Sequence, residues 1–392
     1  MKSRQWFGIW LLTVLGALAA IGCWIVRIDP FFHYHKPDTE RYFYVLDSER
    51  NQNDGITRQF DYEALITGTS MTENFKTSEL EDLFGVRAVK VPASGGTFKE
   101  INDIISRALQ YQPKLKLVVR GLDLNHVFSA PDSLRQDLGK YPEYLYDNNL
   151  FNDVEYVFNR SVIFSRAYQM ELARKQDGFS AGITSFDSYV NWMKSFQFGI
   201  NTVCPDGIEE PAQRAPEALT EEEFRLLEQN VQENVISIAA AYPDVSFYYF
   251  FPPYSAVWWR DRLDDGSAWK YVEAQRYIAE QSIPYHNIYL FSFFSRTDLT
   301  TDLNNYKDET HYGEWISSLL LKWMHNGEYR LTEENYQEAL LAEYDDYASY
   351  PYSDLNGQPD YTDDYLAAAS LHEELSGIRQ ASDADAVTSD KA

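Results

Sequence analysis

An uncharged apolar run near the amino end, residues 6–26, is the feature that most constrains this chain of 392 residues. A helix of 21 residues rises about 30 Å, which is the thickness of the hydrocarbon core of a bilayer. Two basic residues precede the run, and Arg27 closes it. Because basic residues stay on the cytoplasmic side, we expect residues 1–5 in the cytoplasm, residues 6–26 in the membrane and everything after Arg27 outside.

Two processing signals compete with an uncleaved anchor. Ala17-Leu18-Ala19 resembles a signal-peptidase site, and Ala20-Ile21-Gly22-Cys23 resembles a lipobox. However, the apolar run continues past the first signal, and the residues after Cys23 are too apolar for a typical mature lipoprotein start. We therefore predict an uncleaved single-pass anchor in the cell membrane, with cleavage and lipidation as the alternatives.

The charge and the cysteines narrow the class of protein. A formal net charge of −26 argues against nucleic acid as a partner, because phosphates would be repelled. The final segment, residues 331–392, has 15 acidic residues against 2 basic ones, and we expect it to be a helical and then disordered tail. The only cysteines are Cys23 and Cys204, so an exported domain has no internal disulfide, which fits a Gram-positive envelope.

Residues 27–330 read as one α/β domain outside the membrane. Short apolar runs alternate with helical patterns, as in a mainly parallel sheet. Capping boxes at Thr97 and Thr220 open two of the helices. A long insertion without strand alternation, residues 126–216, is either a lid or substrate-binding element or a structural elaboration. The predicted strands are residues 64–67, 88–91, 115–120, 246–251 and 284–290.

Polar residues follow these strands where their carboxyl ends should meet. Ser70 comes directly after the first strand, in Gly68-Thr69-Ser70, and Asp308-Glu309-Thr310-His311 precedes a late helix. Taken separately, each has an ordinary structural interpretation, Ser70 as a serine in a turn and Asp308 as the cap of a helix. Together with His311 they provide a hydroxyl, a base and an orienting acid, the three parts that activate a serine nucleophile.

These motifs resemble those of the SGNH (GDSL-like) hydrolase superfamily, in particular the membrane-anchored bacterial branch with the D-alanyl-lipoteichoic acid biosynthesis protein and polysaccharide O-acetyl-handling proteins. The resemblance covers about residues 60–125 and 245–325. It implies a flavodoxin-like α/β/α fold with five strands in the order 2-1-3-4-5. It also implies a nucleophile at Ser70 and an Asp-x-x-His pair at Asp308 and His311, with no metal and no cofactor.

The resemblance also implies an oxyanion hole. The family glycine corresponds to Gly95 or Gly96, and we expect backbone N–H groups of Ser70 and Gly96 to bind the oxyanion. The family asparagine aligns by spacing with Asp123, whose carboxylate cannot donate a hydrogen bond unless it is protonated, and Asn125 two residues later is the alternative. We also expect Tyr254, which follows a strand, to line the pocket.

Two hypotheses of function follow. The first is an extracytoplasmic serine esterase or acyltransferase that acts on small acyl esters, acetyl or D-alanyl, of a cell-envelope glycan or teichoic acid. The resemblance implies a multispanning membrane acyltransferase as a partner. The second is a non-catalytic SGNH-like module that binds glycan or scaffolds an envelope complex. Asp123 in place of the family asparagine favours the non-catalytic module, whereas the intact set of Ser70, Asp308 and His311 favours the enzyme.

Overall fold

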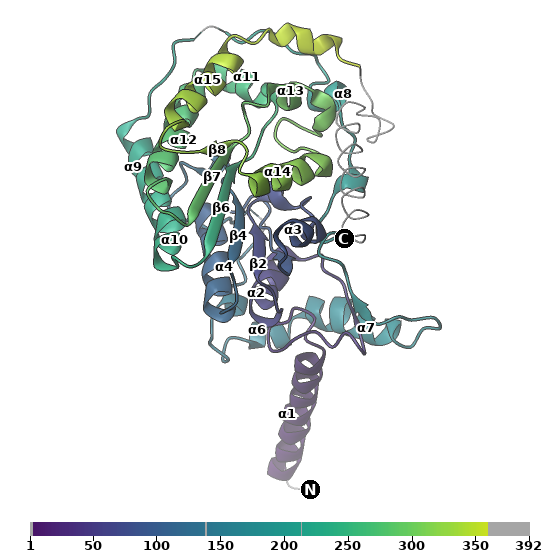
Figure 1. Ribbon diagram of the computed structural model, residues 1–392. Coiled ribbons are helices and arrows are strands. Elements are labelled where there is room, and N and C mark those ends of the chain that lie inside the picture. Colours follow the sequence, from purple (N-terminus) through teal and green to yellow (C-terminus); the bar gives the residue numbers. More distant parts are fainter. Residues whose placement is uncertain (1–2, 138, 213, 360–392) are drawn as a thin grey trace, which may run out of the picture.

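A mainly parallel sheet of six strands forms the centre of the protein in the computed structural model, which describes residues 3–137, 139–212 and 214–359 (Figure 1). The spatial order is β3-β2-β4-β6-β7-β8. The first five strands run parallel, and β8 pairs antiparallel with β7. The strands are β2 (Ala64–Thr67), β3 (Ala88–Lys90), β4 (Leu117–Gly121), β6 (Ser246–Phe251), β7 (Ile288–Ser292) and β8 (Arg330–Leu331).

The prediction of an α/β domain with a mainly parallel sheet is confirmed. Every residue of β2, β3 and β4 is buried, as expected for strands that are covered on both faces. The sheet has a sixth strand because the chain returns after the helix at residues 314–326 and adds β8 at the edge. The last parallel strand starts at Ile288, later than predicted, because Asn287 occupies a turn where its Nδ2 donates to the carbonyls of Ala239, Tyr242 and Val245.

Two groups of helices flank this sheet (Figure 1). One group is the pair α3 (Thr77–Phe84) and α14 (Glu314–Asn326), which contact each other. The other group packs around α4, which contacts β2. Both predicted capping boxes are present, at Thr97 and at Thr220. This second group consists of α2 (Glu49–Gln59), α4 (Phe98–Tyr111), α9 (Glu221–Val231), η5 (Gln232–Ile236), α10 (Ser237–Ala241) and α12 (Ala268–Ser282).

The insertion at residues 126–216 consists of short elements. Its strand β5 (Gly182–Ile183) pairs with β1 (Phe43–Tyr44) in a separate two-stranded sheet. This pairing ties the insertion to the segment that follows the N-terminal apolar helix α1 (Ser3–Ile28). The other elements of the insertion are α5 (Glu143–Tyr146), α6 (Val154–Val157), the π-helical η3 (Ser161–Ala167), α7 (Tyr168–Ala173), η4 (Met193–Ser195) and α8 (Ile200–Val203).

The folded domain extends past residue 330, where the sequence placed the start of the tail. The helix α15 (Tyr336–Ala348) packs against α12 and α11 (Ala256–Asp265), and it buries Leu340 and Tyr347. Tyr347 and Tyr352 of this segment therefore belong to the hydrophobic core. The disorder predicted from about residue 377 lies outside the described residues.

The helix α1 (Ser3–Ile28) projects from one end of the domain (Figure 1). It has a mean hydropathy of 2.3 over its most apolar stretch and is long enough to cross a membrane. Only Ile25 and Ile28 are buried, at the end that joins the domain. The predicted orientation, with the amino end in the cytoplasm, stays a prediction.

Glu343 on α15 is buried and accepts a hydrogen bond from Ser292 Oγ at 2.9 Å. Burial raises the pKa of its carboxyl to about 8. Between an unfolded pKa near 4.5 and this value, the unfolded chain releases the proton and the folded chain keeps it, so Glu343 lowers stability progressively as pH rises, and no further above pH 8. We expect Glu343→Gln to be more stable than the wild type at pH 8 by a few kcal/mol, since one pKa unit corresponds to about 1.4 kcal/mol.

Thermal unfolding of the full-length protein in micelles from pH 5 to pH 9 would measure this difference. The control is Glu338→Gln, an exposed position on the same helix, which should follow the wild type at every pH. A stability difference between Glu343→Gln and the wild type that is the same at pH 5 and pH 8 would contradict the assignment.

Candidate active site

A tight turn at the carboxyl end of β2 presents Ser70. Gly68 has φ +152°, and a Cβ there would lie 2.7 Å from Thr72 Cγ2, so only glycine fits between the strand and the next turn. Thr69 then caps a 3₁₀ turn, η1 (Ser70–Thr72), that begins with the serine itself. The serine is therefore held at the strand end and stays partly exposed.

A hairpin-like loop brings the histidine to the same place. Tyr306 and Tyr312 form an isolated antiparallel bridge, and Lys307 N donates to His311 O at 3.0 Å. The hydroxyl of Tyr312 donates to Met71 O at 3.3 Å, which ties this loop to the turn that carries Ser70. These bonds fix the two segments relative to each other, although they are separated by about 240 residues in the sequence.

Ser70, His311 and Asp308 form a continuous hydrogen-bonded chain. Ser70 Oγ lies 2.7 Å from His311 Nε2, and His311 Nδ1 lies 2.9 and 2.8 Å from the two carboxylate oxygens of Asp308. A carboxylate accepts, so Nδ1 carries the proton and Nε2 is free to accept from the serine hydroxyl. The predicted juxtaposition of the three residues is therefore present, in the order that serine nucleophiles require.

The backbone next to His311 keeps Asp308 ionised. Burial acts to raise the pKa of Asp308, but the hydrogen bond and the charge of His311 outweigh it. The N–H groups of Thr310 and His311 donate to Asp308 Oδ1 at 3.0 and 2.8 Å and act in the same direction. Together they lower the pKa to about 2. The carboxylate consequently stays charged opposite the imidazole throughout the physiological pH range.

The Asp123 carboxylate accepts hydrogen bonds from groups around the site and donates none. The alignment by spacing that placed Asp123 in the oxyanion hole is therefore corrected. The carboxylate is buried and accepts from Thr69 Oγ1 at 2.8 Å, from Asn125 N at 3.0 Å and from the Tyr254 hydroxyl at 2.5 Å. Tyr254 itself is fully buried, so the expectation that it lines the pocket is wrong. Both residues hold the turn that precedes Ser70 in place.

Asn125 is the amide that can donate. Its Oδ1 accepts from Trp258 Nε1 at 3.0 Å, and because an indole N–H can only donate, the amide must turn its oxygen to Trp258. The Nδ2 group then points away from Trp258, and within the described part of the chain it has no hydrogen-bond partner. Asn125 is exposed and follows β4, beside the Asp123 carboxylate that holds Thr69. Of the two positions considered for the family asparagine, Asn125 is therefore the better candidate for an oxyanion donor than Asp123.

The two glycines differ in what their N–H groups can do. Gly96 N donates to Ala93 O at 2.8 Å, so this N–H closes a turn and the expected role of Gly96 as an oxyanion donor is wrong. Gly95 has φ +57°, and Arg135 Nη1 occupies the place where a Cβ would stand, 2.0 Å away. Gly95 is therefore the position at which a glycine is required.

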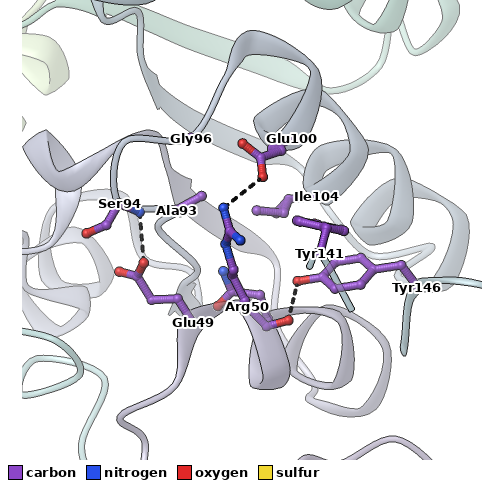
Figure 2. Close-up of a pocket in the computed structure, with 10 residues that line it drawn as sticks. Glu49, Arg50, Ala93, Ser94, Gly96, Glu100, Ile104, Tyr141 and Tyr146 are labelled. Atoms are coloured by element: carbon purple, nitrogen blue, oxygen red, sulfur yellow. Dashed lines mark hydrogen bonds and ion pairs between the residues drawn. The ribbon is translucent and has the colours of Figure 1, made fainter. Parts of the chain in front are cut away.

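Figure 2 shows a small cavity lined in part by this glycine loop, and Ser70, His311 and Asp308 are not among its lining residues. Glu49 accepts from Ser94 N at 2.8 Å, and Ser94 Oγ donates to Glu73, three residues after the nucleophile. Burial raises the pKa of both carboxyls, and the charge of Glu73 raises that of Glu49 further. These contacts fasten the glycine loop to the turn that carries Ser70.

The insertion contributes a residue that the sequence analysis did not single out. The ring of Trp192 meets the His311 ring edge to face at 5.9 Å, and Lys307 Nζ lies 4.0 Å from the centre of the Trp192 ring and 3.8 Å from that of Phe196. A tryptophan inside a long irregular segment gives no local signal of this contact. The lid or substrate-binding alternative is therefore favoured for residues 190–198.

In comparisons with protein-family models, curated proteins and solved structures, no significant match to this chain was found. Among the residues that the structure describes, no group of three or more His, Cys, Asp or Glu side chains is arranged to hold a metal ion. The chemistry of the site is therefore argued from its own geometry.

We expect Asp123→Asn to destabilise the protein by about 1–3 kcal/mol, because an amide replaces a buried acceptor that receives three hydrogen bonds. Urea unfolding of the full-length protein would measure the loss. The exposed Asp132→Asn, which follows the same strand at a distance, serves as the control and should leave the urea midpoint unchanged. An Asp123→Asn variant as stable as the wild type would show that Asp123 does not hold the site together.

Proposed function

We propose that this protein is a membrane-anchored serine esterase or acyltransferase of the SGNH type that forms an acyl intermediate on Ser70. The observation that carries the proposal is the chain from Ser70 Oγ through His311 to Asp308, with 2.7 Å between the hydroxyl and Nε2. The mainly parallel α/β sheet supports the proposal, and we include in it the flavodoxin-like order 2-1-3-4-5 for the parallel strands β3-β2-β4-β6-β7 of the six-stranded sheet.

The reaction follows from the positions of these groups. His311 Nε2 takes the proton of the Ser70 hydroxyl while Oγ attacks the carbonyl carbon of an acyl ester. The Ser70 N–H and the Asn125 amide stabilise the oxyanion of the tetrahedral intermediate. Its collapse breaks the bond to the alcohol, which leaves with the proton from His311, and the acyl group stays on Ser70.

The second half of the reaction reverses these roles. A water molecule or a glycan hydroxyl loses its proton to His311 Nε2 and attacks the acyl carbon, and Ser70 Oγ recovers the proton as it leaves. Water as acceptor makes the protein an esterase, and a glycan hydroxyl makes it an acyltransferase. Asp308 remains ionised in both halves and stabilises the imidazolium.

The substrate class comes from the resemblance and from the anchor. A domain tethered by α1 and held outside the membrane would meet acetyl or D-alanyl esters of a cell-envelope glycan or teichoic acid. Phe196 beside the site is 50% exposed and offers an aromatic ring on which a sugar packs, with Lys307 Nζ over one of its faces. A multispanning membrane acyltransferase that supplies the acyl group is the partner that the resemblance implies.

The nucleophile is tested by covalent labelling. We expect a fluorophosphonate probe to label the full-length protein and Ser70→Ala to abolish both the labelling and the turnover of p-nitrophenyl acetate, because among the described serines Ser70 alone has a histidine partner. Ser237→Ala, which removes an exposed serine hydroxyl on α10 that donates to Glu233 O, is the control and should still be labelled. A folded wild type that is neither labelled nor active would contradict the proposal.

The oxyanion donor is tested by a second series. Asn125→Ala should lower kcat about 10²–10³-fold with little change in KM, because the donor acts on the charge that develops in the transition state. Trp258→Phe removes the indole N–H that orients the amide, together with part of a buried ring, but keeps the Asn125 donor, so its loss should be smaller. In the double variant the two losses should not multiply, because Trp258 acts through Asn125. Multiplicative losses would mean that Trp258 contributes independently.

A further inference from the structure

An apolar platform lies beside the end of the membrane helix. Among the described residues, thirteen large apolar side chains outside α1 are exposed, and seven of them lie between residues 150 and 172. Phe151 is 92% exposed and Phe164 59%. We call these seven side chains the apolar platform. An exposed apolar cluster of this kind marks an interaction site, since single exposed side chains would be scattered.

The platform belongs to an element pair that is apolar on two sides. Phe164, Tyr168 and Leu172 recur every four residues along η3 and α7 and therefore form one exposed stripe. Val162 and Ala167 of the same pair are buried against the domain. Burial within this chain thus accounts for one side of the pair, and the exposed stripe remains uncovered.

The contacts of α1 set the height of the platform relative to the membrane. Both α6 and η3 contact α1 (Figure 1). Val157 of α6 lies 3.4 Å from the position of a Cβ on Gly22, four residues before the apolar run ends at Val26. Four residues of helix rise about 6 Å, which is within the 5–10 Å depth at which interfacial helices lie.

The length of α1 requires the same arrangement. Ile21, Trp24 and Ile25 pack against the domain, so the part of the apolar run free of the domain is residues 6–20. Fifteen residues rise about 22 Å, which is less than the hydrocarbon thickness of about 30 Å. To complete the span, the residues around Gly22 must lie within the membrane, and the elements packed against them must enter its outer leaflet.

The charge of the segment is compatible with lipid headgroups. Residues 150–175 contain four basic and three acidic side chains, whereas the whole chain has a net charge of −26. Arg160 and Lys175 are exposed in the same segment, and the exposed Arg174 pairs with Glu171 at 2.8 Å. Exposed basic residues in such a segment bind phosphate groups while the apolar side chains enter the acyl region.

We propose that residues 150–172 insert into the outer leaflet of the membrane as a monotopic platform that supplements α1. The occupant of the exposed apolar side chains is lipid. With two attachments, α1 and the platform, the domain has one fixed orientation over the bilayer instead of turning about a single helix. The active site consequently works at a constant height above the membrane surface.

The test places an environment-sensitive fluorophore at single cysteines in the full-length protein, reconstituted in nanodiscs of phosphatidylcholine and phosphatidylglycerol. The native Cys23 and Cys204 are replaced by alanine. Phe151→Cys and Phe164→Cys report on the platform. Phe224→Cys, an exposed apolar position on α9, is the matched control. Quenching is measured with a lipid that carries a doxyl group near its headgroup and with iodide in solution.

We expect the labels at positions 151 and 164 to be quenched by the doxyl lipid and to be severalfold less sensitive to iodide than the label at position 224. Quenching of all three labels by iodide alone would overturn the proposal. Labels at 151 and 164 that are shielded from both quenchers would overturn it too, in favour of a protein occupant. Analytical ultracentrifugation would show whether that occupant is a second copy of the chain.

Discussion

The carboxylate of Asp123 is the interaction on which the candidate site depends. It accepts from the hydroxyl of Thr69 at the end of β2 and from that of Tyr254 after β6, and it caps the turn that follows β4. Three neighbouring strand ends therefore converge on one buried anion. In a parallel sheet such ends share one edge, but only a side-chain contact of this kind fixes their loops relative to each other.

The catalytic candidates are held by contacts of the same type. The loop with Asp308 and His311 is tied to the Ser70 turn through Tyr312, and the Ser255 hydroxyl donates to Glu309 O at 2.8 Å. The turn that carries Ser70 and the loop that carries Asp308 and His311 are thus tied to each other, and the loop is also tied to Ser255 after β6. A site of this kind is rigid before substrate arrives, which favours stabilisation of a transition state without reorganisation.

The insertion connects α1 with the candidate site. Its early part, residues 150–172, contacts α1, and its later part brings Trp192 against His311. The same insertion therefore touches both the apolar helix and the candidate site. The proposed attachment to the outer leaflet and the proposed chemistry on envelope glycan consequently depend on one segment that has no strand pairing with the main sheet.

Local sequence patterns were enough to predict the elements and part of the site. The apolar run of α1, the buried strands and the capping boxes at Thr97 and Thr220 all reflect spacing along a few residues, where backbone geometry leaves little choice. The pairing of Asp308 with His311 is of this kind too, because three residues separate them.

Only the tertiary structure decided which distant groups meet. Ser70 and His311 are 241 residues apart, and nothing local to either one reports their contact. The same holds for Asn125, whose amide is oriented by Trp258, and for Asp123, which alignment by spacing had placed in the oxyanion hole. The exposure of the platform side chains could not be predicted from the sequence either, since an apolar residue is buried or exposed according to what packs on it. Periodicity reports the conformation of a segment, whereas partners and burial depend on contacts between segments.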